Sequence, residues 1–172
     1  FADLVKVLDS DWSEALTHGD DLAVTFGIVN AASPTHAMAK VPGQLSFCLD
    51  LRSAEKDILE RTNAKLTKQI AKIEAERPGI RFALGPRSHS IPVKLSSMLL
   101  KGLRQAALDL HQRPPEMLSG GGHDAAAFAT AGWDASMLFV RNEHGSHNPD
   151  ETMDLHDLAE AVAVLGHWLD QK

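Results

Sequence analysis

The chain has 172 residues, of which 44% are hydrophobic and 23% are charged, and its formal net charge is −6 at pH 7. This composition is that of an ordinary globular protein, and it lacks the basic excess that binding to a nucleic-acid backbone requires. No apolar run approaches the roughly 18 residues that span a bilayer, so nucleic acid and membrane are both excluded as expected partners.

The first half of the chain predicts helices and strands that pack into one small layered domain. Residues 2–17 carry apolar side chains at spacings of three and four, which predicts an amphipathic helix. Residues 22–29 are apolar and β-branched, and residues 44–52 alternate between apolar and polar side chains, which predicts two strands. A long charged helix over 55–77 and a short strand over 80–84 follow. This order matches a split β-α-β ferredoxin-like sandwich that lacks its first strand.

The only cysteine, Cys48, lies on the polar face of the alternating run. A single cysteine cannot form an internal disulfide, so we expect a reducing compartment, the cytoplasm. No activating histidine lies at a predictable distance from it in the sequence, so we interpret this thiol as structural.

A polar, proline-containing connection over 85–92 predicts a domain boundary, which we place between residues 1–86 and 87–172. The second part is expected to hold three helices and one buried strand, with helices over 94–111, over 123–130 and from about 154 onward, and the strand over 136–140. The predicted class is therefore α/β, or more exactly α+β, in two parts.

Two glycine- and histidine-rich stretches in the second part look like active-site loops: SGGGHDA over 119–125 and NEHGSHNPDE over 142–151. Imidazole is a common metal ligand and acid-base group near neutral pH. Six of the nine histidines lie in the last 62 residues, and they are His111, His123, His144, His147, His156 and His167. His147 is the strongest candidate, because it follows a predicted strand at the edge where α/β enzymes place their sites. The alternative is a histidine exposed on a surface loop.

The glycine-rich stretch leads into a predicted helix whose free N–H groups point at whatever lies in front of them. This favours an anion or oxyanion site at Gly120–His123, and the alternative is a plain glycine-rich turn. Arg52 ends the alternating strand on its polar face, where a guanidinium is suited to hold a carboxylate. The alternative partner of Arg52 is Asp50, two residues back on the same face.

Three segments of the chain resemble segments of a known family and occur in the same order as they do there. The runs SGGGHDAAAFA and NEHGSHNPDE are similar to the closing part of the zinc amidohydrolases that include N-carbamoyl-L-amino-acid hydrolases, allantoate amidohydrolases and β-alanine synthase, within the aminoacylase and carboxypeptidase-G-like group. The run KVPGQLSFCLDLRS resembles their lid-domain strand. The resemblance implies a longer protein, in which a ferredoxin-like lid that also dimerises interrupts a two-metal catalytic domain. Residues 1–86 would belong to the lid and residues 87–172 would be the C-terminal part of the catalytic domain.

The resemblance also implies roles for individual residues. His147 would be a zinc ligand, Arg52 would bind the substrate carboxylate, and Gly122 with His123 would contact the substrate. Two divalent ions, zinc or alternatively manganese or another divalent metal, would be bound in the intact enzyme. The general base and the other ligands would lie outside this chain, so no catalytic residue is expected in it and the chain alone is expected to be inactive. The partners would be a small carboxylate-bearing substrate and a second copy in a homodimer.

One position departs from the family pattern and leaves the exact substrate open. The family commonly has a substrate-contacting asparagine where this chain has Ala39. His36 and Lys40 flank the same loop, and each reaches either a ligand or only water. Two other classes of function stay open: a non-catalytic dimerisation module in which Arg52 is structural, and a small protein that binds an anion such as phosphate at Gly120–His123.

Overall fold

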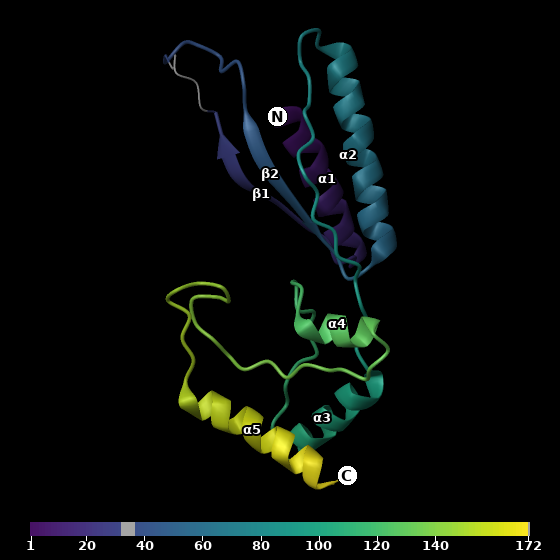
Figure 1. Ribbon diagram of the computed structural model, residues 1–172, viewed down its shortest axis with the longest axis vertical. Coiled ribbons are helices and arrows are strands. Elements are labelled where there is room, and N and C mark those ends of the chain that lie inside the picture. The colour runs from purple at the N-terminus through teal and green to yellow at the C-terminus, as the bar shows by residue number, and fades with distance from the viewer. Residues whose placement is uncertain (32–36, 172) are drawn as a thin grey trace. The chain divides into compact units, whose positions relative to one another are not determined.

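The computed structural model describes residues 1–31 and 37–171 (Figure 1). It divides into two compact units, Phe1–Pro92 and Val93–Lys172, and each is described by itself. The division lies at the end of the polar connection over 85–92. The assignment of the two units to a lid and to a catalytic domain stays a prediction.

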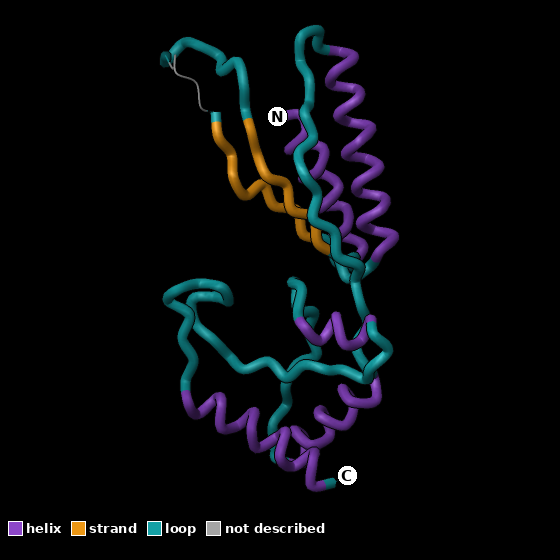
Figure 2. The backbone as a smooth tube through the Cα atoms, in the orientation of Figure 1, coloured by secondary structure: helices purple, strands orange, loops and turns teal. Residues whose placement is uncertain are grey.

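The first unit is a two-stranded antiparallel sheet covered by two helices. Helix α1 (Ala2–His18) precedes strand β1 (Ala23–Asn30), and strand β2 (Ser46–Arg52) precedes helix α2 (Lys56–Glu76). Figure 2 shows the two paired strands in orange beside the helices. The pairing runs from Ala23 opposite Arg52 to Asn30 opposite Ser46, with a shift of register between Phe26 and Val29. These four elements confirm the helices and strands predicted before residue 78.

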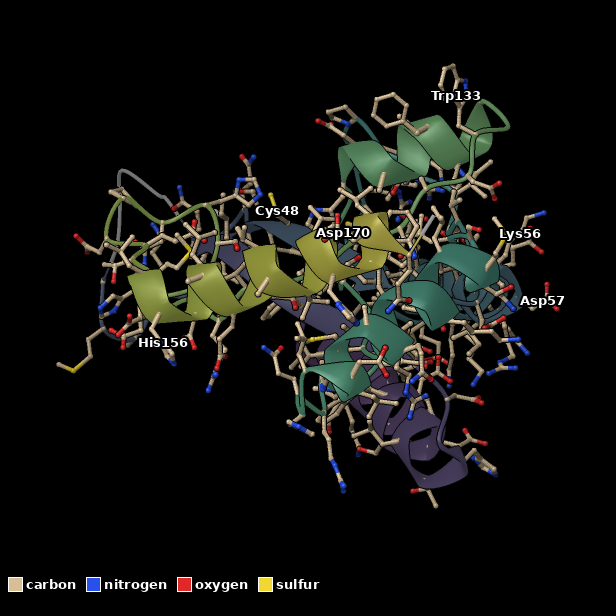
Figure 3. The ribbon with its side chains drawn as sticks, turned by 90° about the horizontal axis from the view of Figure 1, so that it is seen from below. Cys48, Lys56, Asp57, Trp133, His156 and Asp170 are labelled. Carbon is tan, nitrogen blue, oxygen red and sulfur yellow. The ribbon has the colours of Figure 1, made fainter. Side chains whose placement is uncertain are left out.

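The core of this unit forms because one face of each strand is apolar. Leu4 and Leu8 of α1 and Ile73 of α2 are almost completely buried. The partly buried side chains that pack against them are Val24, Phe26, Phe47, Leu49, Leu66, Ile70 and Phe82. The other face of β2 is exposed and carries Cys48, whose position Figure 3 labels. The alternation of the strand therefore places Arg52 on an open face.

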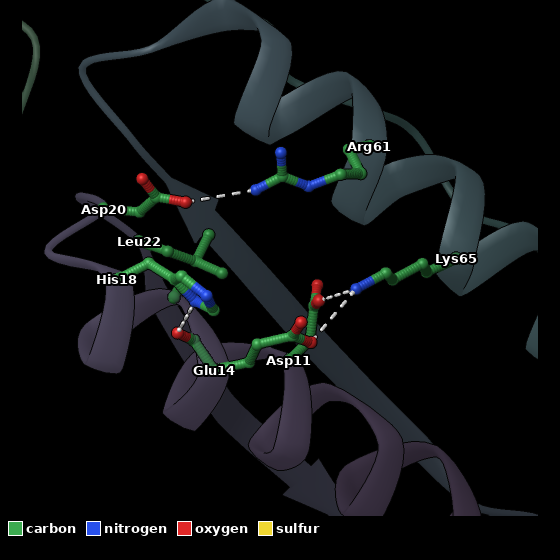
Figure 4. A pocket seen from close by; sticks show the side chains of 8 residues that line it. Asp11, Glu14, His18, Asp20, Leu22, Arg61 and Lys65 are labelled. Atoms are coloured by element: carbon green, nitrogen blue, oxygen red, sulfur yellow. Dashed lines mark hydrogen bonds and ion pairs between the residues drawn. The ribbon is translucent and has the colours of Figure 1, made fainter.

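Charged side chains join α1 to α2 around a hollow (Figure 4). Asp11 is buried, accepts a hydrogen bond from Thr62 Oγ1 at 3.1 Å and forms an ion pair with Lys65. Arg61 pairs with Asp20 at 3.3 Å. A buried carboxylate persists only when such partners replace its hydration. The charges around this hollow therefore serve the contact between the two helices.

The strand expected over 80–84 is absent from the sheet that the described residues form. The backbone N–H of Phe82 donates to Glu74 Oε1 at 2.7 Å, and the Phe82 ring packs on the core. An extended segment becomes a strand only when its backbone groups pair with a neighbour. In the described part of the chain, β1 and β2 pair with each other alone.

The second unit contains three helices, α3 (Ser97–Asp109), α4 (Asp124–Thr130) and α5 (Leu155–Asp170). Ala106 and Ala107 of α3 pack on Val164 of α5, and all three are buried. A Cβ atom added at Gly102 would lie 2.5 Å from Nε1 of Trp168, so the glycine lets the indole lie against α3. The three helices confirm those predicted. Among the described residues, none of the helices is long and apolar enough to cross a membrane.

The strand expected over 136–140 is also absent from the described residues. Among them, this segment pairs with no other strand. Leu138 packs on the core between α3 and α5, as a buried strand would. Its segment has no strand beside it there, for the same physical reason as residues 80–84. Farther along, Glu143 and Thr152 form one isolated antiparallel bridge.

Candidate functional site

Arg52 lies at the end of β2, opposite Ala23 of β1. Its Nε donates to Asp50 Oδ2 at 2.6 Å, and the two side chains are 57% and 49% exposed. The structure thus contains the alternative partner expected from the sequence. Exposed ion pairs contribute only about 0.2–1 kcal/mol to stability. Replacing Asp50 by another carboxylate as the partner of Arg52 would therefore cost little free energy.

The loop over 142–151 is organised around the carboxylate of Glu151. Its Oε1 accepts from Asn142 Nδ2 at 2.6 Å and from Ser146 Oγ at 3.1 Å, and its Oε2 accepts from the backbone N–H of His147 at 3.2 Å. These hydrogen bonds, that of Asn142 above all, lower the pKa of Glu151 below its ordinary value, against a smaller opposing effect of desolvation. Glu151 is therefore held as an ionised acceptor.

His147 has a left-handed backbone conformation, with φ of 63°. A residue with a Cβ atom adopts the left-handed region at a cost of roughly 1–2 kcal/mol. It keeps this conformation only where the surrounding structure holds it. His144 has φ of 65°, and its carbonyl accepts from Asn148 Nδ2 at 2.8 Å. The backbone bridge between Glu143 and Thr152 closes the base of the loop. The loop is thus fixed at several points, and His147 is displayed on it.

The glycine-rich loop is held by its own polar contacts. Ser119 Oγ donates to the carbonyl of Gly121 at 2.8 Å, and Gly120 is left-handed with φ of 65°. His123 is the N-cap residue of α4, and its ring meets Phe139 edge-on with centroids 5.9 Å apart. A Cβ atom at Gly122 would meet nothing within 4 Å, so this position faces open space. Gly122 and His123 are therefore accessible on the surface of the second unit.

Metal ligands do not gather into a complete set within the described residues. No group of three or more histidine, cysteine, aspartate or glutamate side chains lies close enough there to hold an ion. A zinc site needs three or four protein ligands. His147 supplies one imidazole, on a loop whose backbone is held by hydrogen bonds, so the described residues offer one candidate ligand and not a whole site.

The residues that restrain His147 were not found by sequence reasoning. Asn142, Ser146 and Glu151 lie in the quoted run NEHGSHNPDE, but the spacing assigns no role to them. Asp150 and Glu151 are adjacent carboxylates, and only the folded loop shows that Glu151 turns toward the backbone of His147. His36, a candidate from the first part of the chain, lies outside the described residues.

Comparison with known proteins decides the family. Residues 10–171 match the model of Peptidase family M20/M25/M40. The chain belongs to this family. An N-carbamoyl-L-amino-acid amidohydrolase of Pseudomonas sp. strain NS671 is 33% identical over 157 residues, which cover 88% of this chain and 37% of the relative. An allantoate amidohydrolase of Escherichia coli strain K12 is 30% identical over 167 residues, which cover 96% of this chain and 40% of the relative.

Solved structures agree with this family assignment. An amidase of the hydantoinase/carbamoylase family from Burkholderia multivorans superposes with a TM-score of 0.83 at 26% identity. The match covers 97% of this chain and 39% of the amidase. A second such amidase, from Burkholderia vietnamiensis, has a TM-score of 0.71 at 26% identity, over 97% and 40%. The chain therefore spans less than half the length of these relatives.

These matches confirm the resemblance to the amidohydrolase group and the α+β class, a mixture of helices and one small antiparallel sheet. The roles expected for Arg52, Gly122, His123 and His147 stay predictions.

Proposed function

We propose that the full-length protein is a metal-dependent amidohydrolase that cleaves linear amide or ureido C–N bonds. The substrate class is that of the relatives: an N-carbamoyl-L-amino acid, allantoate or a related small carboxylate. The observation that carries the proposal is the loop over 142–151. In a chain of this family, it displays His147 from a left-handed backbone that three side chains restrain.

His147 is proposed as one protein ligand of a two-metal site that holds zinc, manganese or another divalent ion. Bound ions of this kind lower the pKa of water and polarise a carbonyl group. The remaining ligands and the general-base glutamate are proposed to come from residues outside this chain. The 172-residue chain alone is therefore proposed to be inactive, because one imidazole does not hold a pair of ions.

Arg52 is proposed to select substrates that end in a carboxylate. A guanidinium binds a carboxylate through two parallel N–H···O bonds, which fix its orientation as well as its position. The exposed contact with Asp50 leaves the side chain accessible to solvent. Gly122 and His123 are proposed to contact substrate, because the open space at Gly122 permits close approach of a ligand to the backbone.

The assignment of the two units follows from the same proposal. The first unit would be a lid that also mediates a homodimer, and the second unit would be the C-terminal part of the catalytic domain. We also propose a cytoplasmic location, because the exposed thiol of Cys48 stays reduced there.

Metal analysis of the full-length protein, combined with assays of hydrolysis, tests the proposal. We expect about two divalent ions per wild-type subunit and release of ammonia from N-carbamoyl-L-amino acids or allantoate. His147→Ala should lose one ion together with at least a hundredfold of activity, since a ligand is removed. His156→Ala is the matched control, because His156 is exposed on α5 and contacts Glu160 at 3.5 Å. A wild-type protein that binds no metal and hydrolyses neither substrate would contradict the proposal.

A further inference from the structure

We propose that Glu151 is a positioning residue that holds His147 in the orientation needed to bind a metal ion. The inference rests on the proposed function, because it assigns Glu151 a role toward the ligand that this function requires. Glu151 is not itself a ligand in this proposal. Its two oxygens already accept hydrogen bonds from the loop.

The hydrogen bonds of Glu151 connect separate parts of the loop. Oε1 accepts from Asn142, at the start of the loop, and from Ser146, next to the histidine. Oε2 accepts from the peptide N–H of His147 itself. A fourth contact, from Asn142 Nδ2 to Ser146 Oγ at 3.3 Å, joins two of the donors to each other. One carboxylate thus restrains the loop on both sides of the bend at His144–Gly145.

The backbone at this bend explains why a restraint is needed. His144, Gly145 and His147 have φ of 65°, 74° and 63°. Two residues with Cβ atoms in the left-handed region raise the energy of this conformation relative to an extended one. Hydrogen bonds to an ionised acceptor are stronger than those to a neutral one, so a carboxylate is well suited to hold it. Without Glu151, we expect the loop to sample other conformations, so that its backbone no longer presents His147 in one direction.

A glutamine at position 151 would offer fewer acceptor sites than the glutamate does. A carboxylate accepts through both oxygens, whereas the amide of a glutamine accepts through one oxygen and donates through its nitrogen. Glu151→Gln can therefore serve either Asn142 with Ser146 or the N–H of His147, but not all three. This substitution keeps the size of the side chain and removes both an acceptor oxygen and the negative charge, so it needs a control for the charge.

Asp150 provides a control in the same loop. Its backbone N–H donates to Asn148 Oδ1 at 3.1 Å, and its carboxylate accepts no hydrogen bond within the described residues. Asp150→Asn changes the net charge as Glu151→Gln does, at the neighbouring position. Any difference between the two variants therefore reports the hydrogen bonds of Glu151 and not the lost charge.

Two measurements on the full-length protein test the inference. The first is amide hydrogen exchange over residues 142–151 in the metal-free protein, and the second is titration with Co²⁺ followed by its visible absorption spectrum. We expect Glu151→Gln to exchange the amide of His147 roughly tenfold faster. We also expect it to weaken Co²⁺ binding about 10- to 100-fold, the range found for groups that orient a metal ligand. The Co²⁺ spectrum should change, and Asp150→Asn should match wild type in each measurement.

The outcomes separate this inference from the proposed function. Unchanged exchange and unchanged Co²⁺ affinity in Glu151→Gln would overturn the inference, and the proposed function would stand if His147→Ala still lost its metal. Equal weakening in Glu151→Gln and Asp150→Asn would also overturn it, because charge alone would then explain the effect. A wild-type protein without metal would refute the proposed function and with it the role toward a metal. Faster exchange in Glu151→Gln would then show only a structural restraint.

Discussion

Backbone conformation distinguishes among the histidines of this chain. In the described residues, the non-glycine positions with positive φ are His111, His144 and His147. His111 follows the end of α3, and its N–H donates to Leu108, which is a common use of a left-handed residue after a helix. His144 and His147 instead lie in a loop held by side chains. Left-handed backbone conformations that do not terminate a helix are often found at functional sites.

Gly122 allows a test of substrate contact that does not disturb the fold. Its φ lies outside the left-handed region, and an added Cβ atom would meet nothing within 4 Å. Gly122→Ala should therefore leave stability unchanged or raise it by about 0.4–1 kcal/mol, because the unfolded chain loses freedom. If the backbone touches substrate, KM should rise roughly tenfold, since the methyl group occupies the path of approach. Thermal unfolding and steady-state kinetics measure both effects.

Gly120 is the control for this prediction. Its φ is 65°, so Gly120→Ala should lower stability by roughly 1–2 kcal/mol through backbone strain. Normal kinetics in Gly122→Ala would show that the position does not contact substrate.

Arg52 can be tested without removing its charge. Arg52→Lys keeps the cation but loses the planar fork, so KM for a carboxylate-bearing substrate should rise about 10- to 100-fold while kcat falls less. The matched control is Arg61→Lys, which alters a surface ion pair with Asp20 in the same unit. An analogue without the carboxylate should be hydrolysed equally by wild type and Arg52→Lys. Equal KM values for wild type and Arg52→Lys with the natural substrate would assign Arg52 to the ion pair with Asp50.

Helices α3 and α5 are joined by polar side chains as well as by the packing of Ala106 and Ala107 on Val164. Asp109 of α3 accepts from Gln105 at 2.8 Å, from Gln171 at 3.2 Å, and lies 3.3 Å from Nε2 of His167. The hydrogen bond from Gln105 is the largest cause of the lowered pKa of Asp109, followed by those from Gln171 and His167. An ionised Asp109 therefore adds the polar contacts with His167 and Gln171 to the apolar packing between the two helices.

This dependence predicts the direction of an acid effect. Because the pKa of Asp109 is lower in the folded state than its ordinary 3.8, its contribution is fully present above pH 3.8 and is lost as the pH falls through the folded value. The midpoint temperature of thermal unfolding of the full-length protein should fall less steeply with decreasing pH in Asp109→Asn than in wild type. Asp170→Asn, at an exposed position of α5, is the control and should behave as wild type. An identical acid dependence in Asp109→Asn would contradict the prediction.

Strand pairing is the feature of the secondary structure that was not correctly predicted from the sequence. Strand β2 was predicted from the alternation around Phe47 and Leu49, because burial of one face is a local property of the sequence. Residues 80–84 and 136–140 are apolar and partly packed, yet neither is paired in the described part of the chain. Pairing needs a neighbour with free backbone groups, and a neighbour is not a local property.

For the whole molecule, the sequence determined the family, the helices, the two central strands and the candidate loops. These features rest on periodicity and on short motifs, which a linear sequence contains in full. Tertiary structure alone decided that Asp11 is buried beside Thr62 and that Glu151 restrains His147, and it showed that Arg52 contacts Asp50, which the sequence offered as one of two alternatives. Each of these depends on the direction in which a side chain points after folding. Direction follows from backbone angles and packing, and neither can be read from the order of residues.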